Sequence, residues 1–92
     1  MTVARVIIDD ALTVDEAAAA LVAARAAIDA GCHRIDLGGL KTVDSAAVAT
    51  LIAIQRYASS RGVHVEFVDV PEALVGLAHL YEVDTLLGVQ GR

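Results

Sequence analysis

Short apolar segments alternate with longer helical patterns along the chain. Three segments are predicted to be strands, namely Val3–Ile8, which is β-branched and apolar, His33–Leu37 and Val63–Val68. Apolar and polar positions alternate within the second and third of these. Because a parallel strand buried on both sides is apolar on both faces, this alternation predicts a sheet that helices cover mainly on one face. The other face is expected to stay partly open.

Three helices are expected, and each is bounded by residues that favour a helix end. The predicted ranges are Ala17–Ala30, about Asp44–Ser60, and Pro71–Tyr81. Before the first, the run Thr13-Val14-Asp15-Glu16 matches a capping box, in which Thr13 and Glu16 satisfy each other's backbone amides. Gly31 and Gly62 follow the first two helices, where a left-handed residue commonly ends a helix.

Two C-terminal features complete the pattern. Pro71 is expected at the first helical position, where its missing N–H is harmless. The last apolar segment, Val83–Val89, fits either a strand or a helical turn.

The order β-α-β-α-β predicts an α/β fold with a parallel core sheet and right-handed crossovers. With 92 residues, the chain is expected to form a single domain over residues 1–92.

Composition and charge narrow the class of protein. Hydrophobic residues make up 57% of the chain and aromatic residues 3%, so the core must consist of Ala, Val, Leu and Ile. The formal charge of −5 disfavours nucleic-acid binding. The longest apolar run, Ala17–Ala24, is too short to span a membrane, and Met1–Asp10 lacks the order of a signal peptide. The single cysteine, Cys32, cannot form an internal disulfide, so a cytoplasmic location is expected.

Few residues are placed for catalysis or for binding a metal. Asp36 and Asp44 could form an acid pair. However, Asp36 is more simply explained as a polar strand residue, and Asp44 as a helix cap. Cys32 next to His33 lacks the second spaced pair of a metal site. Gly38-Gly39 lacks the Lys-Ser/Thr that follows a phosphate loop, so a turn is expected. We therefore expect neither an enzyme nor a bound cofactor.

The segment from Arg34 to Val48 resembles the central signature of STAS domains, the fold of the anti-sigma-factor antagonists. In that family a strand ending in Asp-Leu is followed by a short loop, an Asp-Ser pair and a helix. Asp44 and Ser45 match the pair, and Ser45 matches the position that is phosphorylated in the antagonists. The resemblance implies a small STAS α/β domain. The C-terminal pattern from Pro71 resembles the MlaB-like branch, the STAS subunits of bacterial ABC transporters that move phospholipids.

The resemblance implies a protein partner and a surface that would bind it. In the MlaB-like branch, the partner is the cytoplasmic ATPase subunit, and the transporter maintains the lipid asymmetry of the outer membrane. The alternative is an anti-sigma factor with kinase activity, released when Ser45 is phosphorylated. In both cases the expected surface comprises Thr42, Asp44, Ser45 and Ala46. Either role places the protein in the cytoplasm. It would reach the inner membrane only through its partner and would not insert into the bilayer itself.

Ser45 also has a purely structural interpretation. Serine and aspartate are both preferred at helix N-termini, because their side-chain oxygens accept hydrogen bonds from free backbone amides. On this interpretation Ser45 caps the second helix and has no partner. The sequence predicts in either case that Ser45 lies in the first turn of a helix and is accessible to solvent.

Overall fold

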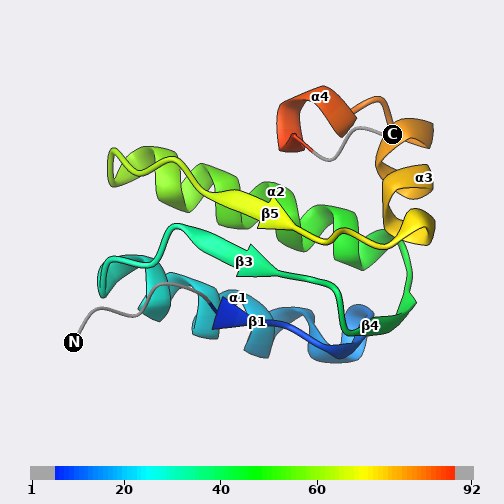
Figure 1. The fold of residues 1–92 in the computed structure, drawn as a ribbon, viewed down its shortest axis with the longest axis horizontal. Coiled ribbons are helices and arrows are strands. Elements are labelled where there is room, and N and C mark those ends of the chain that lie inside the picture. The colour runs from blue at the N-terminus through cyan, green and yellow to red at the C-terminus, as the bar shows by residue number, and fades with distance from the viewer. Residues whose placement is uncertain (1–5, 89–92) are drawn as a thin grey trace.

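The computed structural model describes residues 6–88 of the chain. The elements alternate along the chain, as Figure 1 shows. In order they are β1 (Val6–Ile7), β2 (Asp10–Leu12), α1 (Val14–Asp29), β3 (Arg34–Asp36), β4 (Leu40–Val43), α2 (Ser45–Ser60), β5 (Glu66–Val68), α3 (Glu72–Leu80) and α4 (Asp84–Leu87). Residues 3–5 of the first predicted strand, and Val89, lie outside the described residues.

The central sheet is parallel, with strand order β1-β3-β5. Val6 pairs with Ile35, and Ile35 pairs with Phe67. A second parallel pair joins β2 to β4, with Leu12 opposite Val43. The backbone N–H of Ile8 donates to the Asp36 carbonyl at 3.0 Å, and that of Asp10 to the Gly39 carbonyl at 3.0 Å. The second pair therefore continues the first two strands beyond a bend.

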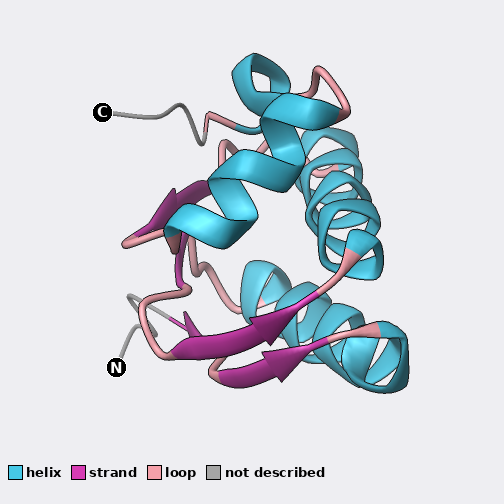
Figure 2. Cartoon of the chain, turned by 90° about the vertical axis from the view of Figure 1, so that its right-hand side faces the viewer, coloured by secondary structure: helices cyan, strands magenta, loops and turns pink. Residues whose placement is uncertain are grey.

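Helices α1 and α2 lie side by side on one face of the sheet (Figure 1), and Figure 2 views them nearly along their axes. On the opposite face Ile7 is 61% exposed. Arg34 and Glu66 form an ion pair there across β3 and β5, with an N–O distance of 3.2 Å. The expectation of a parallel α/β fold with helices mainly on one face is confirmed.

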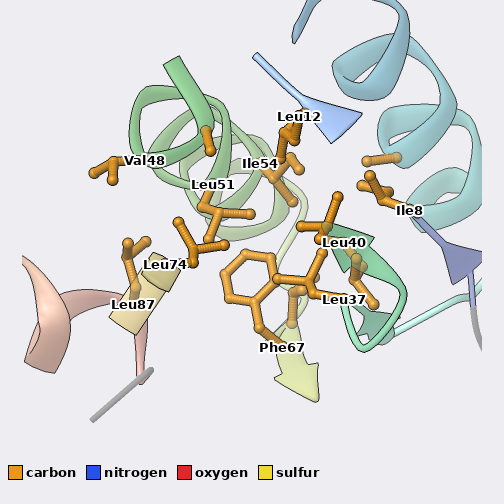
Figure 3. Close-up of a cluster of buried hydrophobic side chains, with 14 of the residues drawn as sticks. Ile8, Leu12, Leu37, Leu40, Val48, Leu51, Ile54, Phe67, Leu74 and Leu87 are labelled. Carbon is orange, nitrogen blue, oxygen red and sulfur yellow. The ribbon is translucent and has the colours of Figure 1, made fainter. Parts of the chain in front are cut away.

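The core lies between this sheet and the helices. Figure 3 shows its aliphatic side chains meeting from strands, from α2, and from the C-terminal helices. Leu51 and Ile54 of α2 are fully buried, and Leu74 of α3 is fully buried beside them. Phe67 is the one phenylalanine of the chain and packs in the same cluster. No helix among residues 6–88 has both the length and the hydropathy to cross a bilayer.

Local chemistry fixes the helix ends as the sequence predicts. The Glu16 carboxylate accepts from the backbone N–H of Thr13 at 2.8 Å and from its hydroxyl at 2.6 Å. These bonds hold the pKa of Glu16 below its ordinary value, the side-chain bond from Thr13 being the larger cause. Gly31 and Gly62 follow α1 and α2 with φ of 100° and 71°, a conformation that costs glycine little.

Several element boundaries differ from the predictions. Helix α1 spans Val14–Asp29, not Ala17–Ala30, because Thr13 is its N-cap. Pro71 is the N-cap residue of α3, with ψ of 149°, and not its first helical residue. The third strand begins at Glu66, not Val63, because Glu66 is the residue that pairs with the start of β3 at Arg34. The ambiguous last segment forms the helical turn α4.

The strands β2 and β4 were not expected. The turn at Gly38 and Gly39 was predicted to lead directly to the second helix, but Leu40–Val43 pairs with Asp10–Leu12. Neither segment has a strong strand composition of its own. Their pairing follows from the turn, because it returns the chain alongside the residues after β1. A Cβ on Gly39 would lie 2.8 Å from the Cβ of Asp9, so this close approach requires glycine.

Candidate protein-interaction site at the start of helix α2

The start of α2 is shaped by Asp44. This residue has extended backbone angles, and its Oδ1 atom accepts a hydrogen bond from the Ala46 backbone N–H at 2.8 Å. Asp44 is therefore the N-cap, as its sequence position predicts. Ser45 is the first helical residue and is exposed, which confirms its predicted position. The interpretation of Ser45 as the cap is wrong, because its neighbour already satisfies the free amide.

The four residues predicted to form the partner surface differ in exposure. Thr42 and Ser45 are exposed, whereas Asp44 and Ala46 are half-buried. The carbonyl of Ala46 accepts from the hydroxyl of Thr50 at 2.7 Å, which ties the first turn to the next. Thr42 and Ser45 therefore present their side chains to solvent, while Asp44 and Ala46 hold the backbone that presents them.

The two long helices begin at the same level. Leu12 pairs with Val43 in the β2–β4 ladder, and each is followed by an N-cap and then a helix. Val14, the first residue of α1, is 72% exposed although it is apolar. The first turn of α2 carries no acidic residue. This end of the molecule thus combines exposed apolar and hydroxyl side chains with two helix N-termini.

The remaining sequence candidates have structural roles. The Oδ1 atom of Asp36 accepts from the backbone N–H of Gly38 at 2.8 Å and so braces the predicted turn. Asp36 and Asp44 accordingly bond different backbone amides. The Cys32 thiol is buried and donates to the Arg34 carbonyl at 3.1 Å. Among the side chains that the structure describes, which leave out those of residues 84 and 85, no three His, Cys, Asp or Glu residues gather as metal ligands could.

A groove between α1 and α2 was not predicted. It has a volume of about 600 Å³. Its lining residues are Leu21, Arg25, Ala49, Ile52, Ala53, Arg56 and Tyr57. On α2 these residues follow Ser45 at intervals of three and four positions, so they share its face of the helix. That spacing is visible in the sequence, but the alanines gave no reason to expect a hollow between the helices.

Aromatic and charged contacts close one end of the groove. The guanidinium carbon of Arg25 lies 4.8 Å from the centroid of the Tyr57 ring, and that of Arg61 lies 5.5 Å from it. The Tyr57 hydroxyl donates to the Asp29 carboxylate at 2.7 Å. That bond holds the pKa of Asp29 below its ordinary value, and Arg61 adds to the effect.

The parallel sheet, the helices on one face and the exposed serine at a capped helix start together define the class of protein. Residues 2–88 match the family model described as "Mlab, STAS domain", so the chain belongs to the STAS domain family. The description of that model connects the match with the MlaB-like STAS domains. STAS domains are protein-interaction modules and are generally regulatory rather than catalytic. A search of the curated proteins finds no match to the chain.

Proposed function

We propose that this protein is an accessory subunit that binds and regulates the ATPase of an ABC phospholipid transporter serving outer-membrane lipid asymmetry. The observation that carries the proposal is the exposure of Ser45 beside an N-cap that is already satisfied by Asp44. Its hydroxyl makes no hydrogen bond with any residue in the range 6–88. This side chain is therefore available to a partner. The MlaB-like family match supports the choice of an ATPase as that partner.

The proposed mechanism is steric and conformational, with no covalent step. The surface is rigid, because the ladder of β2 and β4 and the cap at Asp44 fix the backbone on both sides of Thr42. A preordered surface loses little conformational entropy on binding. If it fits one arrangement of the ATPase better than another, it shifts the population of the ATPase towards that arrangement by the difference in affinity. The protein would act in the cytoplasm, held at the inner membrane through the transporter.

Copurification with the transporter ATPase tests this proposal. Ser45→Glu should weaken the complex at least about tenfold, because the new carboxylate must lose its hydration in the interface. Ser45→Ala removes only a hydroxyl and should weaken it less. Ser59→Glu adds the same charge to an exposed residue at the other end of α2 and serves as the control. Equal binding by Ser45→Glu and wild type would place Ser45 outside the interface.

A second candidate is an anti-sigma-factor antagonist that is switched at Ser45. The supporting observation is that an exposed hydroxyl lies in the first turn of a sixteen-residue helix. A phosphate there is stabilised by the helix dipole, yet adds negative charge to the proposed contact surface. Incubation with a candidate anti-sigma kinase and ATP, followed by intact-mass measurement, tests it. A neighbouring gene for such a kinase favours the switch, and neighbouring permease and ATPase genes favour the transporter.

A further inference from the structure

The groove between α1 and α2 runs along the face that begins at Ser45. Ala49, Ile52 and Arg56 lie about one, two and three turns beyond Ser45 on that face. On the facing helix, Leu21 and Arg25 are one turn apart. This face points away from the strands, because Ala49 and Arg56 are exposed whereas the core residues of α2 are buried.

The floor of the groove is apolar and its walls are basic. Small side chains at Ala49 and Ala53 leave the hollow, and Leu21 and Ile52 line it. Arg25 and Arg56 stand on opposite helices. They belong to the seven Lys and Arg residues of a chain whose formal charge is −5.

The positive charge of the groove is only partly balanced. Helix α2 carries no acidic residue over its whole length. Asp29 is the acidic neighbour on the α1 side, and it is already bound to Tyr57 and to Arg61, the latter at an N–O distance of 3.2 Å. Arg56 makes no ion pair with any of residues 6–88. The groove is therefore a local basic site on an acidic protein.

We infer that this groove receives an acidic amphipathic helix of the protein partner, with apolar side chains on the Leu21–Ile52 floor and carboxylates at Arg25 and Arg56. Laying the apolar face of a helix in a groove is a common mode of peptide recognition. The inference deepens the proposed function and rests on it in one respect: the helix belongs to the partner that contacts Ser45. It also explains why a carboxylate introduced at Ser45 should repel that partner. The new side chain and the partner's acidic helix would both place negative charge on the same face of α2.

Two other occupants fit the groove less well. A membrane surface binds protruding apolar side chains, whereas this site is a hollow, and the net negative charge of the chain opposes anionic lipids. A second copy of this chain would have to insert a convex acidic apolar segment. The apolar side chains exposed on its own surface include Leu80, Tyr81 and Leu86, which lie on and around α3 and α4. If these side chains of one copy docked in the groove of the next, each contact would join two different surfaces head to tail. Such contacts build open filaments unless the rotation between neighbouring copies closes a ring.

A selection of displayed helical peptides against the whole protein tests the inference. The library should vary charge and apolar spacing independently, so that it favours neither outcome. We expect the enriched peptides to carry apolar residues at intervals of three and four positions, flanked by Asp or Glu. Enrichment of basic peptides, of peptides without this spacing, or of none would overturn the inference.

The affinity of the best peptide is then measured on variants by fluorescence polarisation. Arg56→Glu reverses a wall charge, and Ala49→Leu fills the hollow with a residue that favours helix. Each should weaken binding about tenfold. Arg34→Glu, on the open face of the sheet, is the charge-matched control and should change affinity less than about twofold. Melting curves confirm that each variant is folded. Unchanged affinity for Arg56→Glu contradicts the inference.

Two further measurements assign the occupant. Binding of phosphatidylglycerol vesicles that Arg56→Glu abolishes would make the groove a lipid site, and self-association abolished by the same change would make it a contact between copies. Either result overturns the inference. A complex with the transporter ATPase that survives Arg56→Glu unchanged would contradict the groove while leaving the proposed function intact. If the peptides bind as expected but no ATPase complex forms, the proposed function is contradicted while the groove inference stands.

Discussion

Replacing Asp44 should mainly lower the stability of the fold, whereas replacing Ser45 should mainly weaken partner binding. The Asp44 carboxylate accepts the Ala46 amide at 2.8 Å and is half-buried. The hydroxyl of Ser45 is exposed and bonds to none of the residues that the structure describes. Asp44→Ala therefore removes the cap of α2, whereas Ser45→Ala leaves that cap in place.

The size of the difference follows from the cap. Loss of an N-cap side chain costs about 1 kcal/mol. For a domain of this size, that lowers Tm by about 4–8 °C. Ser45→Ala is an exposed change and should lower Tm by less than about 3 °C. Ser45→Glu places a negative charge at the positive end of the helix dipole, so its Tm should equal or exceed that of wild type.

Thermal melting followed by circular dichroism measures all three variants beside wild type. The expected order of Tm is Ser45→Glu highest or equal to wild type, then Ser45→Ala, then Asp44→Ala lowest. An equal fall in Tm for Ser45→Ala and Asp44→Ala would refute the reasoning, because Ser45 would then carry part of the cap. Loss of partner binding by Ser45→Glu could in that case reflect a damaged helix.

Other changes test the electrostatics, the core and the turn. The pKa of Asp29 lies below its ordinary value of 3.8 because of the Tyr57 hydroxyl, so this contact stabilises the fold above that pH and is lost as pH falls through the lowered pKa. Tyr57→Phe should therefore reduce the loss of Tm between pH 7 and about pH 3, and an unchanged acid dependence would contradict this. Leu51→Ala, at a fully buried position, should cost about 2–5 kcal/mol in urea unfolding, and a loss under about 1 kcal/mol would contradict close packing there. Gly39→Ala should lower the urea midpoint because its Cβ would meet Asp9 at 2.8 Å, whereas an unchanged midpoint would show that the turn relaxes freely.

The helix ends were predictable from the sequence because they depend on neighbouring residues alone. The Thr13–Glu16 box closes the start of α1 by bonds within one turn, and Gly31 and Gly62 end helices through their own backbone angles. The position of Ser45 followed from the same local chemistry. The sequence favoured Asp44 as the cap but left Ser45 open as an alternative, and only the hydrogen bond from the Ala46 amide to Asp44 decides between them.

The features that depend on distant pairing were missed. Ala11 and Thr42 lie in strands only because they pair with each other, across a turn that brings residues 10–12 beside 40–43. The groove likewise needs α1 and α2 at one level, which the pairing of Leu12 with Val43 sets. Arg25 and Arg56 are far apart in the sequence, so their joint position on its walls could not be inferred from either helix alone.

The central claim is that the start of α2 contacts the transporter ATPase, and photocrosslinking tests it most directly. A photoreactive residue is placed at Thr42, which is exposed before α2, and in a second protein at His64, which is exposed beyond its other end. Each protein is irradiated with the ATPase subunit of the same organism. The account predicts a crosslink to the ATPase from position 42 and none from position 64. A crosslink from position 64 alone, or from neither position in a complex that still forms, would contradict it.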